Sequence, residues 1–60
     1  MNYPEVTYIV YDSKTFKIHD TFAYWGKDLM NLCNATNGCV INVTHPAAKD
    51  ILNKIIEANK

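Results

Sequence analysis

Glu5-Val6-Thr7-Tyr8-Ile9-Val10-Tyr11 is the stretch that decides the fold. Five of its seven residues are aromatic or β-branched apolar residues, and Thr7 is β-branched as well. Such side chains favour a pleated strand, where their bulky substituents pack against neighbours. A strand buried on one face alternates apolar and polar residues, whereas both alternating sets are apolar here. The stretch therefore predicts a strand at the centre of a small sheet.

A second strand is expected from about Thr15 to Ala23, with Phe16, Ile18 and Phe22 on one of its faces. Between the two strands lies the polar turn Asp12-Ser13-Lys14, in which Asp and Ser can bond to nearby backbone groups. A turn this short makes the two strands an antiparallel hairpin.

A first helix is expected from roughly Lys27 to Thr36, because aromatic residues and Gly26 precede it. Asn37-Gly38 supplies the left-handed residue that commonly follows a helix. A longer helix that starts at Asp20 or Thr21 stays open. It would place one apolar stripe at helical spacing, made of Phe22, Trp25, Leu29, Leu32 and Cys33.

The remaining chain predicts a short strand and a second helix. The strand covers Cys39 to Val43, and the helix runs from about Pro46 to Ala58. Proline suits a first helical turn because its missing N–H would have no partner there. Apolar residues recur at helical spacing through the second helix, at Ala48, Ile51, Leu52, Ile55 and Ile56.

The expected fold is α+β, in the order β-β-α-β-α, as a single domain over residues 1–60. With the first strand central, the three-stranded sheet has the order 2-1-3. We expect both helices on one face of the sheet, since two short helices would hardly cover both. The other face would then stay exposed. It would bear either residues such as Ile9 and Tyr11 or the alternating set of residues on the same strand. An exposed apolar sheet face indicates an interaction surface or a dimer interface.

Composition limits the functional classes. The chain is 48% apolar and 20% charged, which is typical of a globular protein. Its net charge is zero, so it lacks the excess of positive charge that usually attracts a protein to nucleic-acid phosphates. Lysine supplies all six basic residues, so arginine, the usual bidentate reader of guanine, is absent. A chain of this length buries only about 60% of its unfolded surface, which favours help from a partner subunit.

No apolar run reaches the roughly 18 residues of a membrane-spanning helix, and the N-terminus does not resemble a signal peptide. The sequence therefore predicts a cytoplasmic protein that does not enter a membrane. In that compartment Cys33 and Cys39 are expected to be reduced thiols.

The aromatic residues are the main candidates for a binding site, and they are concentrated in the first half of the chain. They can fill a small core, anchor a protein interface, or stack on nucleobases. We favour the core for most of them and a protein interface next. The residues chosen for binding are Tyr8, Ile9, Tyr11, Tyr24 and Trp25.

No motif predicts catalysis. His19 and Asp20 are neighbours, but adjacent strand residues point to opposite faces. His45 precedes Pro46 and is interpreted as a helix-cap residue. The two cysteines and two histidines lack zinc-site spacing, and no glycine pattern for phosphate is present. We therefore expect neither an enzyme nor a metal or cofactor.

The sequence predicts a small protein-binding module that regulates or inhibits a larger protein and forms a homodimer through a sheet face or edge. Its size would fit an origin in a phage or another mobile element, which would make it a viral protein. The alternative is a nucleic-acid-binding protein that uses the sheet aromatics with Lys14, Lys17 and Lys27.

Overall fold

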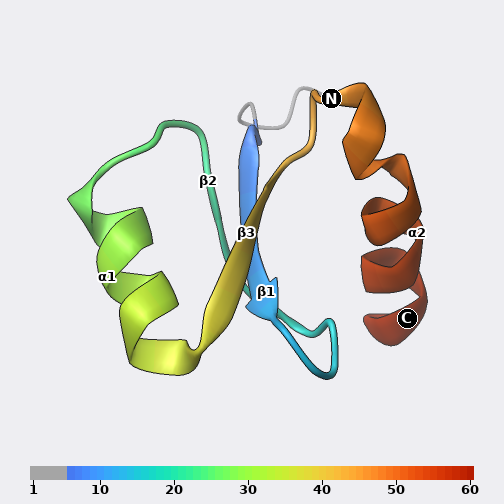
Figure 1. Ribbon diagram of the computed structural model, residues 1–60, viewed down its shortest axis with the longest axis horizontal. Helices are drawn as coiled ribbons and strands as arrows, with labels where there is room; N and C mark the ends of the chain where they lie inside the picture. The colour runs from blue at the N-terminus through green and yellow to red at the C-terminus, as the bar shows by residue number, and fades with distance from the viewer. Residues whose placement is uncertain (1–5) are drawn as a thin grey trace.

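The elements follow one another in the order expected from the sequence (Figure 1). The computed structural model describes residues 6–60. It contains the elements β1 (Tyr8–Asp12), β2 (Ile18–Phe22), α1 (Lys27–Thr36), β3 (Gly38–Asn42), the short 3-10 helix η1 (Pro46–Ala48) and α2 (Lys49–Ala58). The three strands form one antiparallel sheet in the order β2-β1-β3. The predicted α+β class, element order and sheet order are confirmed.

Most predicted boundaries are close to the observed ones. Helix α1 begins and ends at the predicted residues, and η1 and α2 together span the predicted second helix. Strand β1 begins at Tyr8, whereas the predicted start at Glu5 lies outside the described residues. The longer first helix is wrong, because Asp20 and Thr21 belong to β2.

The two helices lie on opposite faces of the sheet, so the prediction that both cover one face is wrong (Figure 1). Ile9 and Tyr11 are buried in one cluster with Ile55 of α2. Val10 points to the other face, where α1 packs on β1 and β3 and buries Leu29 completely. Three strands spaced about 4.8 Å apart are scarcely wider than one helix of about 10 Å, so one helix covers each face.

The chain passes from α1 into β3 through a tight turn. Asn37 has the left-handed conformation expected after the helix, with φ of 53°. Gly38 follows without a positive φ, and its role is close approach: a Cβ there would lie 2.9 Å from Cγ1 of Val10 and 3.0 Å from Oγ1 of Thr36. Glycine thus lets the end of α1 press against the central strand.

The hairpin between β1 and β2 is held by the C-terminal end of the chain. The side chain of Asn59 accepts a hydrogen bond from Ile18 N–H at 3.0 Å and donates to the carbonyl oxygen of Phe16 at 2.9 Å. Phe16 itself has a positive φ of 62° and stacks on Tyr11 with 5.6 Å between ring centroids. Phe16 therefore belongs to the turn and not to the second strand, where the sequence pattern placed it.

Replacing Asn59 by alanine removes both bonds to the hairpin. We expect Asn59→Ala to lower the free energy of unfolding by about 1–2 kcal/mol, the cost of two exposed hydrogen bonds. Urea denaturation measures this change. Asn53→Ala is the matched control, because Asn53 is exposed on α2, the helix that Asn59 follows, and should change stability by less than about 0.5 kcal/mol. Equal effects of the two variants would show that the hydrogen bonds from Asn59 to the hairpin do not stabilise the protein.

The hairpin also predicts how stability depends on pH. Backbone N–H groups of Thr15 and Lys14 bond to Oδ1 of Asp12 at 2.9 and 2.8 Å and hold the pKa of that carboxyl below its ordinary value of 3.8. A lowered folded-state pKa stabilises the protein above the ordinary value, and this contribution is lost as the pH falls through the folded-state pKa. We expect Asp12→Asn, which keeps an acceptor oxygen, to unfold more easily than wild type at pH 6. The difference should shrink towards pH 2 in urea titrations, and a pH-independent difference would contradict this account.

Candidate functional site

An exposed aromatic loop joins β2 to α1. The chain leaves β2 after Phe22 and must reach the start of α1 at Lys27, which lies on a face of the sheet. This short connection carries Tyr24 and Trp25 outward, with 83% and 55% of their surfaces exposed. Gly26 ends the loop in an extended conformation and precedes the helix without a side-chain cap.

Tyr8 fixes the position of the Trp25 ring. The two rings meet edge to face, with centroids 5.4 Å apart and planes inclined by 78°. Tyr8 is half-buried on the central strand, so the tryptophan is anchored to the most constrained part of the sheet. We call Tyr8, Tyr24 and Trp25 the aromatic surface. Edge-to-face pairs contribute about 0.5–1.5 kcal/mol beyond burial, which is enough to orient an exposed indole.

The other two residues chosen from the sequence lie elsewhere. Ile9 and Tyr11 are 9% and 6% exposed and pack beneath α2, so the predicted uncovered face does not contain them. Burial raises the pKa of the Tyr11 phenol, as do the charge of Cys39 and a hydrogen bond with it to a smaller extent. Of the five predicted binding residues, the structure thus brings Tyr8 and Trp25 into contact, leaves Tyr24 exposed next to Trp25 in the loop, and places two in the core. A binding role for Ile9 and Tyr11 stays a prediction, and neither offers a surface in this arrangement.

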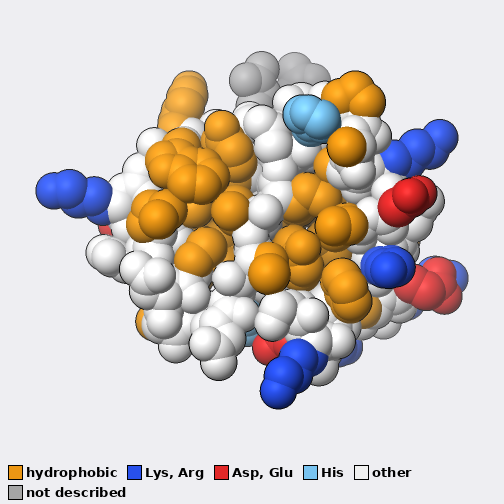
Figure 2. All heavy atoms as spheres, viewed as in Figure 1, with side chains coloured by type: hydrophobic (Ala, Val, Ile, Leu, Met, Phe, Trp, Pro, Cys, Tyr) orange, Lys and Arg blue, Asp and Glu red, His pale blue; other side chains and the backbone are white. Residues whose placement is uncertain are grey.

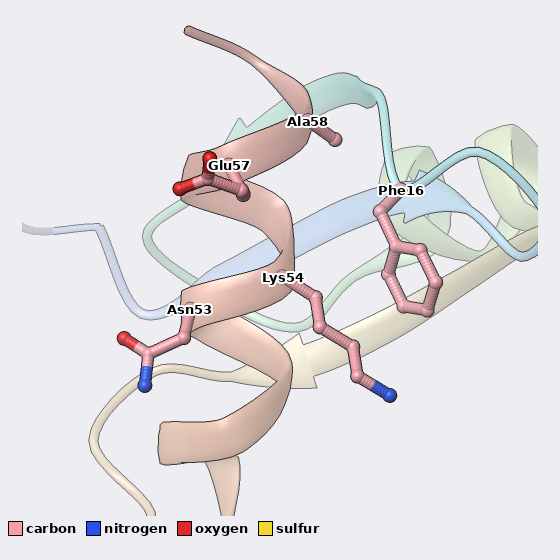
Figure 3. Close-up of a pocket in the computed structure, with 5 residues that line it drawn as sticks. All are labelled: Phe16, Asn53, Lys54, Glu57 and Ala58. Carbon is pink, nitrogen blue, oxygen red and sulfur yellow. The ribbon is translucent and has the colours of Figure 1, made fainter.

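Two hollows border helix α2. An open pocket of about 620 Å³ lies between the hairpin and the helix, and Lys54 Nζ lies 5.6 Å from the ring centroid of Phe16 there (Figure 3). Its lining residues are Phe16, Asn53, Lys54, Glu57 and Ala58. A smaller groove of about 250 Å³ runs beside β3, between that strand and η1. The sequence pattern missed the pocket because it assigned Phe16 to a strand.

The histidines and cysteines considered in the sequence lie on different elements of the described chain. Nδ1 of His45 accepts a hydrogen bond from Ala47 N–H at 3.1 Å, which confirms its interpretation as a cap residue. His19 and Asp20 are exposed neighbours on β2. Cys33 is half-buried on α1 and Cys39 is exposed on β3. Within residues 6–60, no group of three or more His, Cys, Asp or Glu side chains is placed to hold a metal ion.

Comparison of the chain with protein-family models, curated proteins and solved structures found no match. Neither helix in the described part of the chain has the length and apolar character needed to cross a membrane.

Stability measurements can separate the aromatic surface from the core. We expect Tyr24→Ala to change the free energy of unfolding by less than about 0.5 kcal/mol, because the side chain is largely in water. Leu29→Ala should cost about 2–5 kcal/mol, because Leu29 is completely buried between α1 and the sheet. Chemical denaturation monitored by circular dichroism compares the two variants. A large loss for Tyr24→Ala would assign that residue to the fold.

Proposed function

We propose that this chain is a small protein-binding module that regulates or inhibits a larger protein and self-associates. The observation that carries the proposal is the aromatic surface, on which Tyr24 and Trp25 stay exposed although the chain has little apolar surface to spare for its core. Tyrosine and tryptophan dominate the binding energy of protein interfaces.

Anchoring favours Trp25 as the residue that contributes most to binding. Its contact with Tyr8 restricts the indole before any partner arrives, so less conformational entropy is lost on association. Tyr24 lies next to it with most of its ring available. Two adjacent aromatic side chains that become buried together supply the apolar centre that a protein interface needs.

The distribution of lysine argues against nucleic acid as the partner. Lys14 and Lys17 belong to the hairpin that follows β1, whereas the aromatic surface lies at the Tyr8 end of that strand. A five-residue strand separates the two ends by roughly 15 Å. A single-strand binder needs stacking rings and phosphate contacts along one path, and only Lys27 is adjacent to the aromatic loop in sequence.

The test uses the tagged protein as bait in a lysate of cells that encode it, with nuclease present. We expect a captured protein that binds the purified wild-type chain directly. Trp25→Ala should weaken that binding by about 30-fold, the typical effect of losing a central interface residue. Calorimetry or surface plasmon resonance with the purified partner measures the dissociation constant.

Ile56→Ala is the matched control, because Ile56 is 60% exposed on α2, away from the loop, and its removal should change the affinity less than twofold. Equal affinity of Trp25→Ala and wild type would contradict the proposal. Salt-sensitive binding of a labelled single-stranded oligonucleotide at 150 mM salt would support the nucleic-acid alternative instead.

A further inference from the structure

Strand β3 has an outer edge that no other described strand covers, because the sheet order is β2-β1-β3. Val43 N–H donates to the carbonyl oxygen of Thr7 at 2.8 Å. In an antiparallel pair, residues that bond to the neighbouring strand alternate with residues that point away. Ile41 and Cys39 therefore bond to β1, whereas the backbone groups of alternate residues face outward, at Gly38, Val40 and Asn42. Of these, the Asn42 carbonyl oxygen accepts a hydrogen bond from His45 N–H at 3.1 Å in the turn that follows the strand.

The two edges of the sheet differ in their protection. Strand β2 exposes His19 and Asp20, and its pairing with β1 contains a register shift after Val10. Charged side chains and irregular pairing are the usual devices that keep an edge from pairing with another chain. Strand β3 has neither device: it contains no charged residue or proline and pairs with β1 in unbroken register over five residues.

Apolar surface borders the outer edge of β3. The groove of about 250 Å³ follows the strand on the α2 side, where Ala47 and Ile51 line it. Figure 2 shows hydrophobic side chains on both sides of a white band in the middle of the molecule, and Figure 1, in the same view, places β3 there. An added strand would thus gain hydrogen bonds along the edge and apolar contacts on either side of it.

We infer that β3 pairs antiparallel with β3 of a second copy of this chain, in a register centred on Val40. Two Val40 residues then exchange both of their backbone hydrogen bonds, and Gly38 lies opposite Asn42 of the second copy on each side. This register matches every outward-facing residue of the strand, and a two-fold axis passes between the two valines. In a register centred on Cys39, Asn42 would lie opposite Thr36 of the second copy. Thr36 belongs to α1, so Asn42 would have no strand residue as its partner.

A second copy fits this edge because the strand is complementary to itself. Its outward-facing residues are placed symmetrically about Val40, so each outward N–H lies opposite a carbonyl oxygen of the second copy. The Asn42 oxygen, which already accepts from His45 N–H at 3.1 Å, would accept from Gly38 N–H of the second copy as a second donor. No like charges approach, since Gly38–Asn42 is neutral. The two Val40 side chains meet as a directly opposed β-branched pair, an arrangement that stabilises antiparallel sheets. This inference specifies the self-association in the proposed function and rests on that part of it, but not on the aromatic surface.

The first test is the solution mass of the reduced chain across a concentration series, by light scattering. We expect twice the 6.9 kDa mass of one chain. Val40→Lys places two ammonium groups across the axis and should raise the dimer dissociation constant at least tenfold. Thr21→Lys, which adds the same charge to the exposed edge strand β2, should leave the dimer intact. A monomer at all concentrations, or equal effects of the two variants, would overturn the inference.

A second variant covers the case in which Val40→Lys does not fold. Chemical synthesis of this short chain allows the Val40 amide N–H to be replaced by an ester oxygen while the side chain is kept. The ester removes an outward donor and no bond to β1, so the folded chain should become monomeric. A folded dimer that tolerates the ester would overturn the pairing.

Cross-linking reports the register. In the Val40-centred pairing the two Cys39 residues are diagonal neighbours, with Cα atoms about 7–8 Å apart. In a Cys33→Ser background, a short bismaleimide should join them, whereas mild oxidation should not, because a disulfide needs Cα atoms closer than about 7 Å. Rapid disulfide formation would show that the two Cys39 residues lie directly opposite each other, and it would overturn the register centred on Val40.

Trp25→Ala separates this inference from the rest of the proposed function. It should weaken partner binding by about 30-fold and leave the dimer mass unchanged, since the aromatic loop is not part of β3. If the dimer forms normally but Val40 variants do not weaken it, the proposed self-association is supported and pairing through the edge of β3 is contradicted.

Discussion

The structure depends on complete enclosure of strand β1. Its backbone pairs with a strand on each side, and its two faces are covered by different helices. Val10 is fully buried on one face, and Ile9 and Tyr11 on the other are less than a tenth exposed. Strands β2 and β3 are held by backbone pairing with β1, and residues of α1 and α2 pack against its two faces. A chain of this size has few other residues that could form a core, so five residues of β1 organise most of its packing.

A narrow sheet determines which surfaces remain for binding. Because one helix is enough to cover each face, no broad apolar sheet face is left for a partner. The surfaces proposed for binding are instead a loop and an edge: the aromatic surface between β2 and α1, and the outer side of β3. They are formed by different residues. If β3 pairs with a second copy, the dimer presents two aromatic surfaces related by the two-fold axis, and a partner with two binding sites would gain from effective concentration.

The candidate site was predictable only in part. The residue types that dominate interfaces identified Tyr24 and Trp25, and the structure leaves both exposed. The sequence shows that Ile9 and Tyr11 are as apolar as the residues on the opposite face of the same strand. It does not show which of the two faces a helix covers. The sequence does indicate that the edge of β3 is unprotected, because Cys39–Asn42 lacks charged residues and proline. The sequence did not indicate the pocket at Phe16, because that pocket depends on the turn conformation of Phe16, with its positive φ, and on the approach of α2 from the far end of the chain.

The sequence by itself determined the elements, their order and the central place of β1, because these follow from local periodicity, turn residues and apolar character on both sides of one strand. The Lys27–Thr36 helix and its left-handed end at Asn37 are local in the same sense. Only the tertiary structure decided that the two helices take opposite faces, that Ile9 and Tyr11 are covered, and that Asn59 clamps a hairpin more than forty residues away. These outcomes depend on the width of the sheet and on contacts between distant residues, which no local pattern encodes.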